Sequence, residues 1–305
     1  MSVTEILSRR AALSFEVFPP KTESAMTALC GEGGVLDQLR SLNPDYIACT
    51  YGAGGTDAGK NLEILSKVRA GGCVPVTQFT CAGNTRESAR GQLQNYLDHG
   101  VDHIIALRGV AGTGKADGEL RNAADLVDFA RQTFGGRFTI AVAAAPGGNL
   151  TGEVPEADMD FLKRRQDGGA DFIVTQPCWD MDQFRYWLDA IRAAGIWLPV
   201  EAGVLPLLDQ TAAINAAFSG SGCTMSRELN ELLGQNWIYP NPLTKDPFDA
   251  KIEQKKADFK EAGMEYTINQ INAYRACGVG GIHLLTGNSC ADAARIVREA
   301  GLLNR

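Results

Sequence analysis

A glutamate stands inside an apolar run near the start of the sequence. The run over residues 13–18 reads Leu-Ser-Phe-Glu-Val-Phe, and two prolines follow it. A carboxylate in such a run is costly unless it is paired or protonated. In a strand, Glu16 shares one face with Ser14 and Phe18, and an apolar interior there would favour the neutral acid. Two interpretations stay open: a general acid, or a buried carboxylate bonded to a neighbouring Arg or Lys.

Other polar side chains occur where apolar runs end, and parallel strands gather reactive groups at such places. These residues are Thr50, Tyr51, Gln78, Thr80, Arg108, Gly109, Asn149, Gln176, Thr286 and Asn288. A lone polar residue at a strand end is often structural. The basic triplet at 163–165 is either a solvated helix face or a site for a pyrophosphate or an acidic substrate tail.

The elements that must position these residues alternate along the chain. Short apolar runs predict buried parallel strands at 13–18, 46–50, 74–80, 103–107, 138–144, 172–175, 198–204 and 281–285. Amphipathic stretches between them include 85–98, 123–133, 157–167 and 181–194. Eight such β/α units predict a (β/α)8 TIM barrel, with one domain over residues 1–305. A doubly wound open sheet is the rival, but Phe18-Pro19-Pro20 cannot make its phosphate-binding turn.

The joints between elements support this reading. Gly100, Gly169 and Gly278 each follow a helical stretch and precede a strand, so each is expected to supply a left-handed helix C-cap. The eighth run lies far beyond the seventh, which predicts a helical insertion between strands 7 and 8, around residues 219–256. The proline-containing segment 237–247 is expected to be a surface loop.

Composition narrows the class of protein. The net charge is −7, from 29 basic and 36 acidic residues, so we expect no nucleic-acid partner. No apolar run reaches about 20 residues, so we expect no membrane span. The eight cysteines form no CxxC pair and none lies at ligand spacing from one of the three histidines. We therefore expect free thiols in a reducing cytoplasm and no metal site.

Several motifs together resemble the methylenetetrahydrofolate reductase family. In chain order they are SFEVFPPKT at 14–22, TYGA at 50–53, TC at 80–81, ALRG at 106–109, VAA at 142–144, LKR at 162–164, DGGADFIVTQ at 167–176 and GVLP at 203–206. They follow the family order up to residue 206, and the rest of the chain resembles the family mainly at 278–288. The first motif and the Thr-Gln pair at 175–176 are the most specific.

The resemblance implies a barrel enzyme that binds FAD, takes electrons from NAD(P)H, and converts 5,10-methylenetetrahydrofolate to 5-methyltetrahydrofolate. Carried over by motif, Glu16 would be the general acid at folate N10 and Gln176 would bind the pterin. Gln210 aligns with a residue that stacks on substrate. The cofactor-binding residues would be Thr50, Tyr51, Ala53, Gln78, Arg108, Gly109, Ala123, Asp158, Arg164 and Arg165, the basic ones near the FAD phosphates. We also expect a homo-oligomer or a complex with a partner subunit.

The sequence departs from the family around the flavin and the folate. Val110 replaces an aspartate, and Gln78 and Asn149 replace histidines. Aromatic positions of the family are occupied by Ala145 and Gln210, and its last-strand Tyr and Arg align near Leu285 and Ser289. The favoured hypothesis is a reductase with altered flavin contacts. The alternatives are a flavin-free reductase, a non-catalytic or methyl-transfer-associated subunit that uses the barrel as a docking scaffold, and an enzyme for an unrelated small acid.

Overall fold

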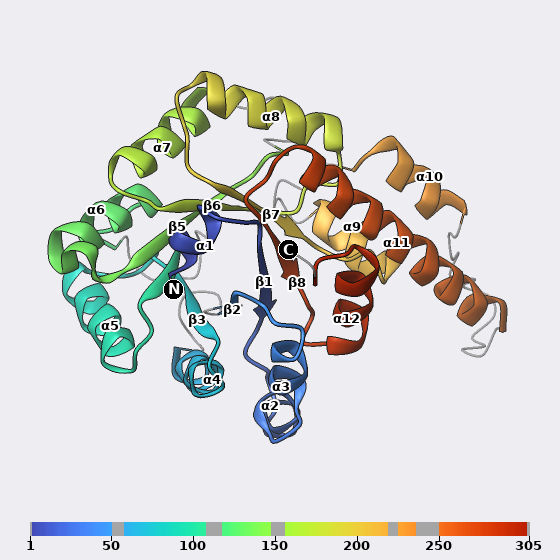
Figure 1. Ribbon diagram of the computed structural model, residues 1–305, viewed down its shortest axis with the longest axis horizontal. Helices are drawn as coiled ribbons and strands as arrows, with labels where there is room; N and C mark the ends of the chain where they lie inside the picture. The colour runs from blue at the N-terminus through green and yellow to red at the C-terminus, as the bar shows by residue number, and fades with distance from the viewer. Residues whose placement is uncertain are drawn as a thin grey trace.

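Eight parallel strands close a barrel in sequence order, and β8 pairs with β1 (Figure 1). The computed structural model describes residues 2–50, 58–107, 118–147, 156–218, 225–235 and 250–303. The strands are β1 Ala12–Val17, β2 Tyr46–Cys49, β3 Val74–Thr80, β4 His103–Leu107, β5 Thr139–Ala144, β6 Phe172–Thr175, β7 Val200–Val204 and β8 Gly281–Leu285. The predicted barrel is confirmed, because the apolar runs that indicated strands are the strands of the sheet.

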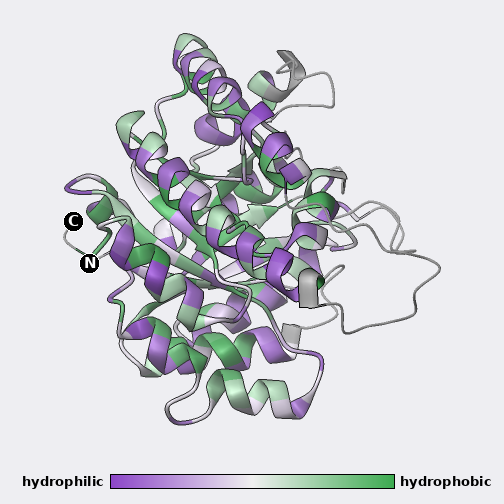
Figure 2. Ribbon diagram, turned by 90° about the vertical axis from the view of Figure 1, so that its right-hand side faces the viewer, coloured by the Kyte–Doolittle hydropathy of each residue, from purple (hydrophilic) through white to green (hydrophobic). Residues whose placement is uncertain are grey.

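Helices surround the barrel in Figure 1 and follow the strands in turn. They are α1 Val3–Leu7, α2 Glu23–Cys30, α3 Val35–Arg40, α4 Ala58–Ala70, α5 Arg86–Asp98, α6 Ala123–Phe134, α7 Glu156–Asp167, α8 Met181–Ala193, α9 Gln210–Phe218, α10 Arg227–Gln235, α11 Ala250–Ala276 and α12 Cys290–Glu299. A 3₁₀ turn, η2 Gly135–Arg137, follows α6. The larger hydrophobic core lies between the sheet and this helical layer, and Figure 2 shows the hydrophobic residues gathered there.

Three glycines end helices where the sequence predicted them. The φ angles of Gly100, Gly169 and Gly278 are 72°, 100° and 73°, which an L side chain rarely adopts. The carbonyl groups at the helix ends are satisfied in the turn, as where the Gly100 N–H donates to the Leu97 carbonyl at 2.9 Å. This left-handed turn redirects the chain into the following strand.

The helix α1 lies across the amino-terminal mouth of the barrel. Val3 is completely buried and packs in the same cluster as the inward-facing residues of the strands, with Leu7 beside it. Ser2 and Glu5 form a capping box that fixes the start of this short helix. The carboxyl ends of the strands open at the opposite mouth, where barrels of this class carry their functional groups.

In the described parts of the segment between β7 and β8 there are three helices, α9, α10 and α11, which confirms the predicted insertion. They bury a separate cluster that contains Leu229, Leu233 and Phe259 together with Trp179 from the loop after β6. Trp179 therefore packs the inserted helices against the barrel. The proposed surface loop at 237–247 lies outside the described residues.

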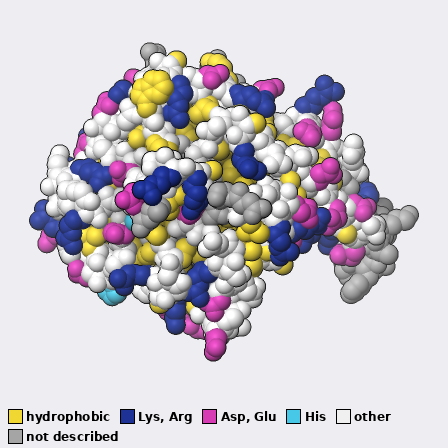
Figure 3. Space-filling view, viewed as in Figure 1, with side chains coloured by type: hydrophobic (Ala, Val, Ile, Leu, Met, Phe, Trp, Pro, Cys, Tyr) yellow, Lys and Arg dark blue, Asp and Glu magenta, His cyan; other side chains and the backbone are white. Residues whose placement is uncertain are grey.

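The outer surface carries both signs of charge. Figure 3 shows Lys and Arg interspersed with Asp and Glu on one face. Helical pairs contribute to this pattern, such as Arg185 with Asp182 at 2.8 Å and Arg295 with Glu299 at 2.8 Å. Within the described part of the chain, no helix combines the length and the apolar character needed to cross a membrane.

Candidate active site

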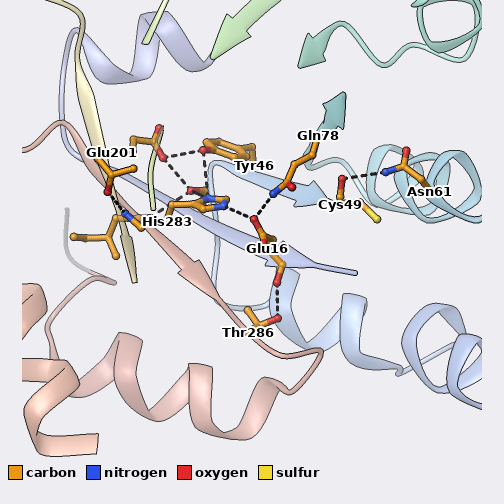
Figure 4. Close-up of polar contacts among 12 residues, drawn as sticks. Glu16, Tyr46, Cys49, Asn61, Gln78, Glu201, His283 and Thr286 are labelled. Carbon is orange, nitrogen blue, oxygen red and sulfur yellow. Dashed lines mark hydrogen bonds and ion pairs between the residues drawn. The ribbon is translucent and has the colours of Figure 1, made fainter. Parts of the chain in front are cut away.

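Glu16 lies near the carboxyl end of β1, and its side chain is 19% exposed. Gln78 Nε2 donates a hydrogen bond to Glu16 Oε2, and His283 Nε2 lies 3.3 Å from the same oxygen (Figure 4). Thr286 Oγ1 donates to the Glu16 carbonyl at 2.8 Å and fixes the backbone there. Among the described residues no side chain bonds to Oε1, so one carboxyl oxygen is available for a ligand.

The surroundings of Glu16 correct the expectation from sequence. An apolar interior or a basic partner was expected, whereas a glutamine and a histidine contact the carboxyl group. The reason is the closure of the barrel. The register pairs Glu16 with Leu285 on β8 and Ser14 with His283, so residues far apart in sequence share one inward-facing layer.

A chain of polar groups continues from His283 into the barrel. Ser14 Oγ lies 2.7 Å from His283 Nδ1 and donates to Glu201 Oε2 at 3.0 Å. Tyr46 also donates to Glu201 Oε2, at 2.9 Å, and its ring stacks on the imidazole at a centroid distance of 5.8 Å. Ser14, Tyr46 and Glu201 are completely buried, and His283 is 1% exposed.

Burial dominates the electrostatics of this layer. It raises the pKa of Glu201 to about 7, although His283, Tyr46 and Ser14 favour the charged form of that carboxyl. Burial, followed by the charge of Glu201, raises the pKa of Tyr46 well above its ordinary value. Tyr46 therefore remains a hydrogen-bond donor, whereas Glu201 can change its protonation near neutral pH.

Gln176 lies directly after β6 and lines a pocket of about 210 Å³. The same pocket is lined by Arg165 and by Trp187, between the ends of β5 and β6 and the helices α7 and α8. Arg165 Nη1 donates to the Ala143 carbonyl at 2.6 Å, which holds the guanidinium group at the pocket. A Cβ at Gly203 would lie 2.0 Å from the Thr175 carbonyl, so this glycine permits the close approach of β7 to the strand end that carries Gln176.

The basic triplet on α7 divides among three environments. Lys163 pairs with Asp167, and Arg164 lies over the ring of Phe161, 5.9 Å from its centroid. Only Arg165 of the three lines the pocket beside Gln176.

Of the other predicted site residues, the structure describes only some. Thr50 is held at the end of β2, because Asn61 from α4 donates to its carbonyl at 2.9 Å. Ala123 is buried at the start of α6, and Gln210 is the first residue of α9. Tyr51, Ala53, Arg108, Gly109, Val110 and Asn149 lie outside the described residues, as does the side chain of Asp158. Among described residues, no cluster of three or more His, Cys, Asp or Glu could hold a metal ion.

Sequence reasoning missed Tyr46, Glu201 and His283. A signal for two of them was present, since Glu201 and His283 stand inside apolar strand runs in the same way as Glu16. Alternation along β1 also placed Ser14 on the face of Glu16. What was lacking was the barrel register that joins β1 to β2 and β8.

Similarity to known proteins identifies the family of this chain. A family model for methylenetetrahydrofolate reductase matches residues 3–301. The chain belongs to the methylenetetrahydrofolate reductase family. Its relatives include methylenetetrahydrofolate reductase (NADH) 1 of Arabidopsis thaliana, 30% identical over 99% of this chain and 50% of that protein. The chain thus spans about half the length of that plant relative.

Bacterial family members are similar in length to this chain but match over a shorter region. The 5,10-methylenetetrahydrofolate reductase of Escherichia coli is 31% identical over 64% of this chain and 64% of that protein. A solved structure of a Clostridium thermocellum protein, described as binding two copies of 5-methyl-5,6,7,8-tetrahydrofolic acid, aligns with a TM-score of 0.60. That alignment covers 97% of this chain and 96% of the other, at 14% identity, and supports the fold alone.

Proposed function

We propose that this chain reduces 5,10-methylenetetrahydrofolate to 5-methyltetrahydrofolate with electrons from NAD(P)H, passed through FAD. The observation that carries the proposal is the position of Glu16. It is a carboxyl group at the catalytic end of the barrel, held on one oxygen by Gln78 and His283 and partly exposed. Membership of the reductase family supports this choice of substrate class.

Glu16 acts as the general acid in this proposal. Its carboxyl proton passes to N10 of the folate, and the bond between N10 and the bridging carbon breaks. The bridging carbon and N5 then form an iminium cation, and hydride addition to that carbon yields the methyl group. A positioned general acid typically accelerates such a step about 10²–10⁴-fold.

Gln176 provides donors and an acceptor for the pterin edge, and Gln210 lies at the start of the helix after β7. The residues present suit FAD, because Arg165 holds a guanidinium group beside the pocket and Arg164 occupies the next position on α7. Arg165 would bind the diphosphate, Arg164 would approach it by leaving the Phe161 ring, and Thr50 at the end of β2 would be a further contact. When bound, FAD would carry the hydride between NAD(P)H and the folate.

The test measures turnover of 5,10-methylenetetrahydrofolate by the purified protein with NADH or NADPH, each with and without added FAD. Glu16→Gln should lower kcat by about 10²–10⁴-fold with little change in KM, because the amide keeps shape but has no transferable acid proton. Ser66→Ala, a hydroxyl loss on α4 that removes only a bond to the Leu62 carbonyl, is the matched control.

The outcomes of this assay distinguish the flavin-dependent reductase from a flavin-free reductase and from a docking subunit. Turnover that is independent of FAD contradicts the flavin route and favours direct hydride transfer. A wild-type protein with no turnover, yet with measurable folate binding, contradicts the reductase proposal and favours a docking subunit. We also propose a homo-oligomer or a partner subunit, because Tyr186 and Trp197 are 61% and 71% exposed; sedimentation analysis distinguishes these from a monomer.

A further inference from the structure

Glu201 is connected to Glu16 by an unbroken series of polar contacts through the barrel interior (Figure 4). Glu201 Oε2 lies 3.0 Å from Ser14 Oγ, which lies 2.7 Å from His283 Nδ1. On the other side of the imidazole, His283 Nε2 lies 3.3 Å from Glu16 Oε2. Each intermediate group can both donate and accept a hydrogen bond, as proton transfer along a series requires.

The backbone is shaped to let Glu201 reach this series. The register pairs Glu201 on β7 with Gly281 on β8 and Gly281 with Ala12 on β1, two residues before Ser14. A Cβ at Gly281 would lie 3.0 Å from Cγ of Glu201. Because Gly281 has no side chain, the Glu201 side chain can pass close to the β8 backbone at this point.

The unsatisfied oxygen of Glu201 points to a proton on this carboxyl. Ser14 and Tyr46 both donate to Oε2, whereas Oε1 is buried with no hydrogen-bond partner among the described residues. A charged carboxylate oxygen in that position lacks any compensating donor, which is costly. The neutral acid avoids most of that cost.

We propose that Glu201 is a positioning residue that shares one proton with Glu16, through Ser14 and His283, and so stores the proton for the general acid. The role in catalysis rests on the proposed reductase function, but the shared proton does not. In one state Glu201 is neutral and Glu16 is a carboxylate; in the other the two are reversed.

The transfer between these states balances. With the Glu201 proton on Oε2 and the Ser14 hydroxyl turned from Glu201 toward His283 Nδ1, the Glu201 proton passes to Ser14 Oγ. The Ser14 hydroxyl proton then passes to His283 Nδ1, and the Nε2 proton of His283 passes to Glu16. Ser14 and His283 each lose one proton and gain one, so both remain neutral. The imidazole changes tautomer, and one negative charge moves from Glu16 to Glu201.

The titratable groups around Glu201 come from β1, β2 and β8, because β6, which pairs with β7 at Val174, carries none. Tyr46 faces it from β2 and His283 from β8, while Glu16 lies beyond on β1. Asp45, before β2, adds a repulsive charge and is itself paired with Arg10. Burial raises the pKa of Glu201 to about 7, so Glu201 retains a proton up to near neutral pH.

Infrared spectroscopy tests the shared proton without substrate, because a protonated carboxyl has a distinct C=O stretch. We expect the wild type to show one such buried band that is lost on titration near neutral pH, and Glu201→Gln to remove or shift that titration. Ser14→Ala should separate the pair into two independent titrations while removing only one oxygen atom. A wild-type titration that persists unchanged in both variants overturns the proposal.

Turnover tests the catalytic consequence. At about pH 8, Glu201→Gln and Ser14→Ala should each lower kcat by up to about 10²-fold, the lower end of what a general acid contributes, because each variant removes the route by which Glu16 regains its proton. KM should stay constant, and Ser66→Ala should match wild type. If Glu201→Gln is impaired but Ser14→Ala is not, Glu201 is merely structural and the proposal is wrong. If wild type has no turnover, the reductase function fails while the infrared result still decides the shared proton.

Discussion

The two halves of the barrel interior differ sharply although they share one sheet. The inward positions of β1, β2, β7 and β8 carry mainly polar groups: Ser14, Glu16, Tyr46, Glu201 and His283. The inward positions of β3 to β6 are mainly apolar: Val76, Ile105, Ala141, Phe172 and Val174. The same two-residue alternation serves both halves, so the backbone does not dictate the difference.

The side chains that stabilise the barrel and the side chains that could do chemistry therefore lie in different halves of its interior. Apolar side chains contribute by burial, and a change of similar volume is tolerated. Buried polar groups contribute to stability only while each has a hydrogen-bond partner. When one partner is lost, the remaining groups stay buried without a hydrogen bond, which is costly. We therefore expect changes in the apolar half to alter unfolding, and changes in the polar half to alter pH dependence and turnover.

The largest effect on stability is expected at Phe172, in the apolar half. Phe172 is 1% exposed and meets the Tyr46 ring edge-on at 6.4 Å. Phe172→Ala should lower the free energy of unfolding by about 3–5 kcal/mol, because a large cavity replaces the ring. Urea denaturation measures this free energy of unfolding. The control is Trp197→Ala, at an exposed position, which should change stability by no more than about 0.5 kcal/mol. Equal losses in the two variants would refute the assignment of stability to this half.

A smaller effect, but one that depends on pH, is expected at Glu201. Burial raises the pKa of Glu201 from 4.5 to about 7, so the folded protein holds this proton more tightly than the unfolded chain. Its contribution is complete at acidic pH and is lost as pH rises through that interval. The loss is on the order of 3 kcal/mol. Glu201→Gln should remove this slope.

The measurement is the free energy of unfolding of wild type and Glu201→Gln at several pH values between about 4 and 8, which brackets the interval set by the shifted pKa. The difference between the two proteins isolates this one carboxyl from all other titrating groups. Parallel curves would mean that Glu201 carries no proton in the folded state at neutral pH.

The smallest effect is expected at Gln78, the side chain of β3 that reaches from the apolar half to Glu16. Gln78→Leu keeps a similar volume but removes a donor to the carboxyl group. A hydrogen bond that positions the neutral acid contributes about 0.5–1.5 kcal/mol, so kcat should fall by up to about tenfold. Gln78→His, which retains a donor, is the matched comparison. Wild-type kcat in the leucine variant would show that Gln78 does not orient the acid.

Much of the fold could be predicted because its signals are local. Strands buried on both faces need continuous apolar runs, and the runs at 74–80, 103–107, 172–175 and 281–285 coincide with strands of the structure. Glycine C-caps depend on a single residue's conformation, so Gly100, Gly169 and Gly278 could be placed from sequence alone. The helical insertion followed from spacing.

The candidate site was less predictable because its signals are non-local. Glu16 and Gln176 stood out by motif, but the partners of Glu16 come from β3 and β8, more than 60 residues away in each case. Which of several inward polar groups meet depends on strand register around a closed barrel, and no local pattern specifies that register. The expected apolar environment of Glu16 was wrong for this reason.

The small helix α1 has a consequence for solvent entry. It is five residues long, and a helix that short has no stability of its own in water. It is held by its capping box and by the packing of Val3 and Leu7 against the inward-facing residues of the strands. Detaching it should therefore require much less free energy than global unfolding. Each such opening would admit deuterium from the solvent to the buried carboxyl of Glu201 through the amino-terminal mouth. Isotope exchange there would therefore report the local opening of this five-residue helix rather than the unfolding of the whole barrel.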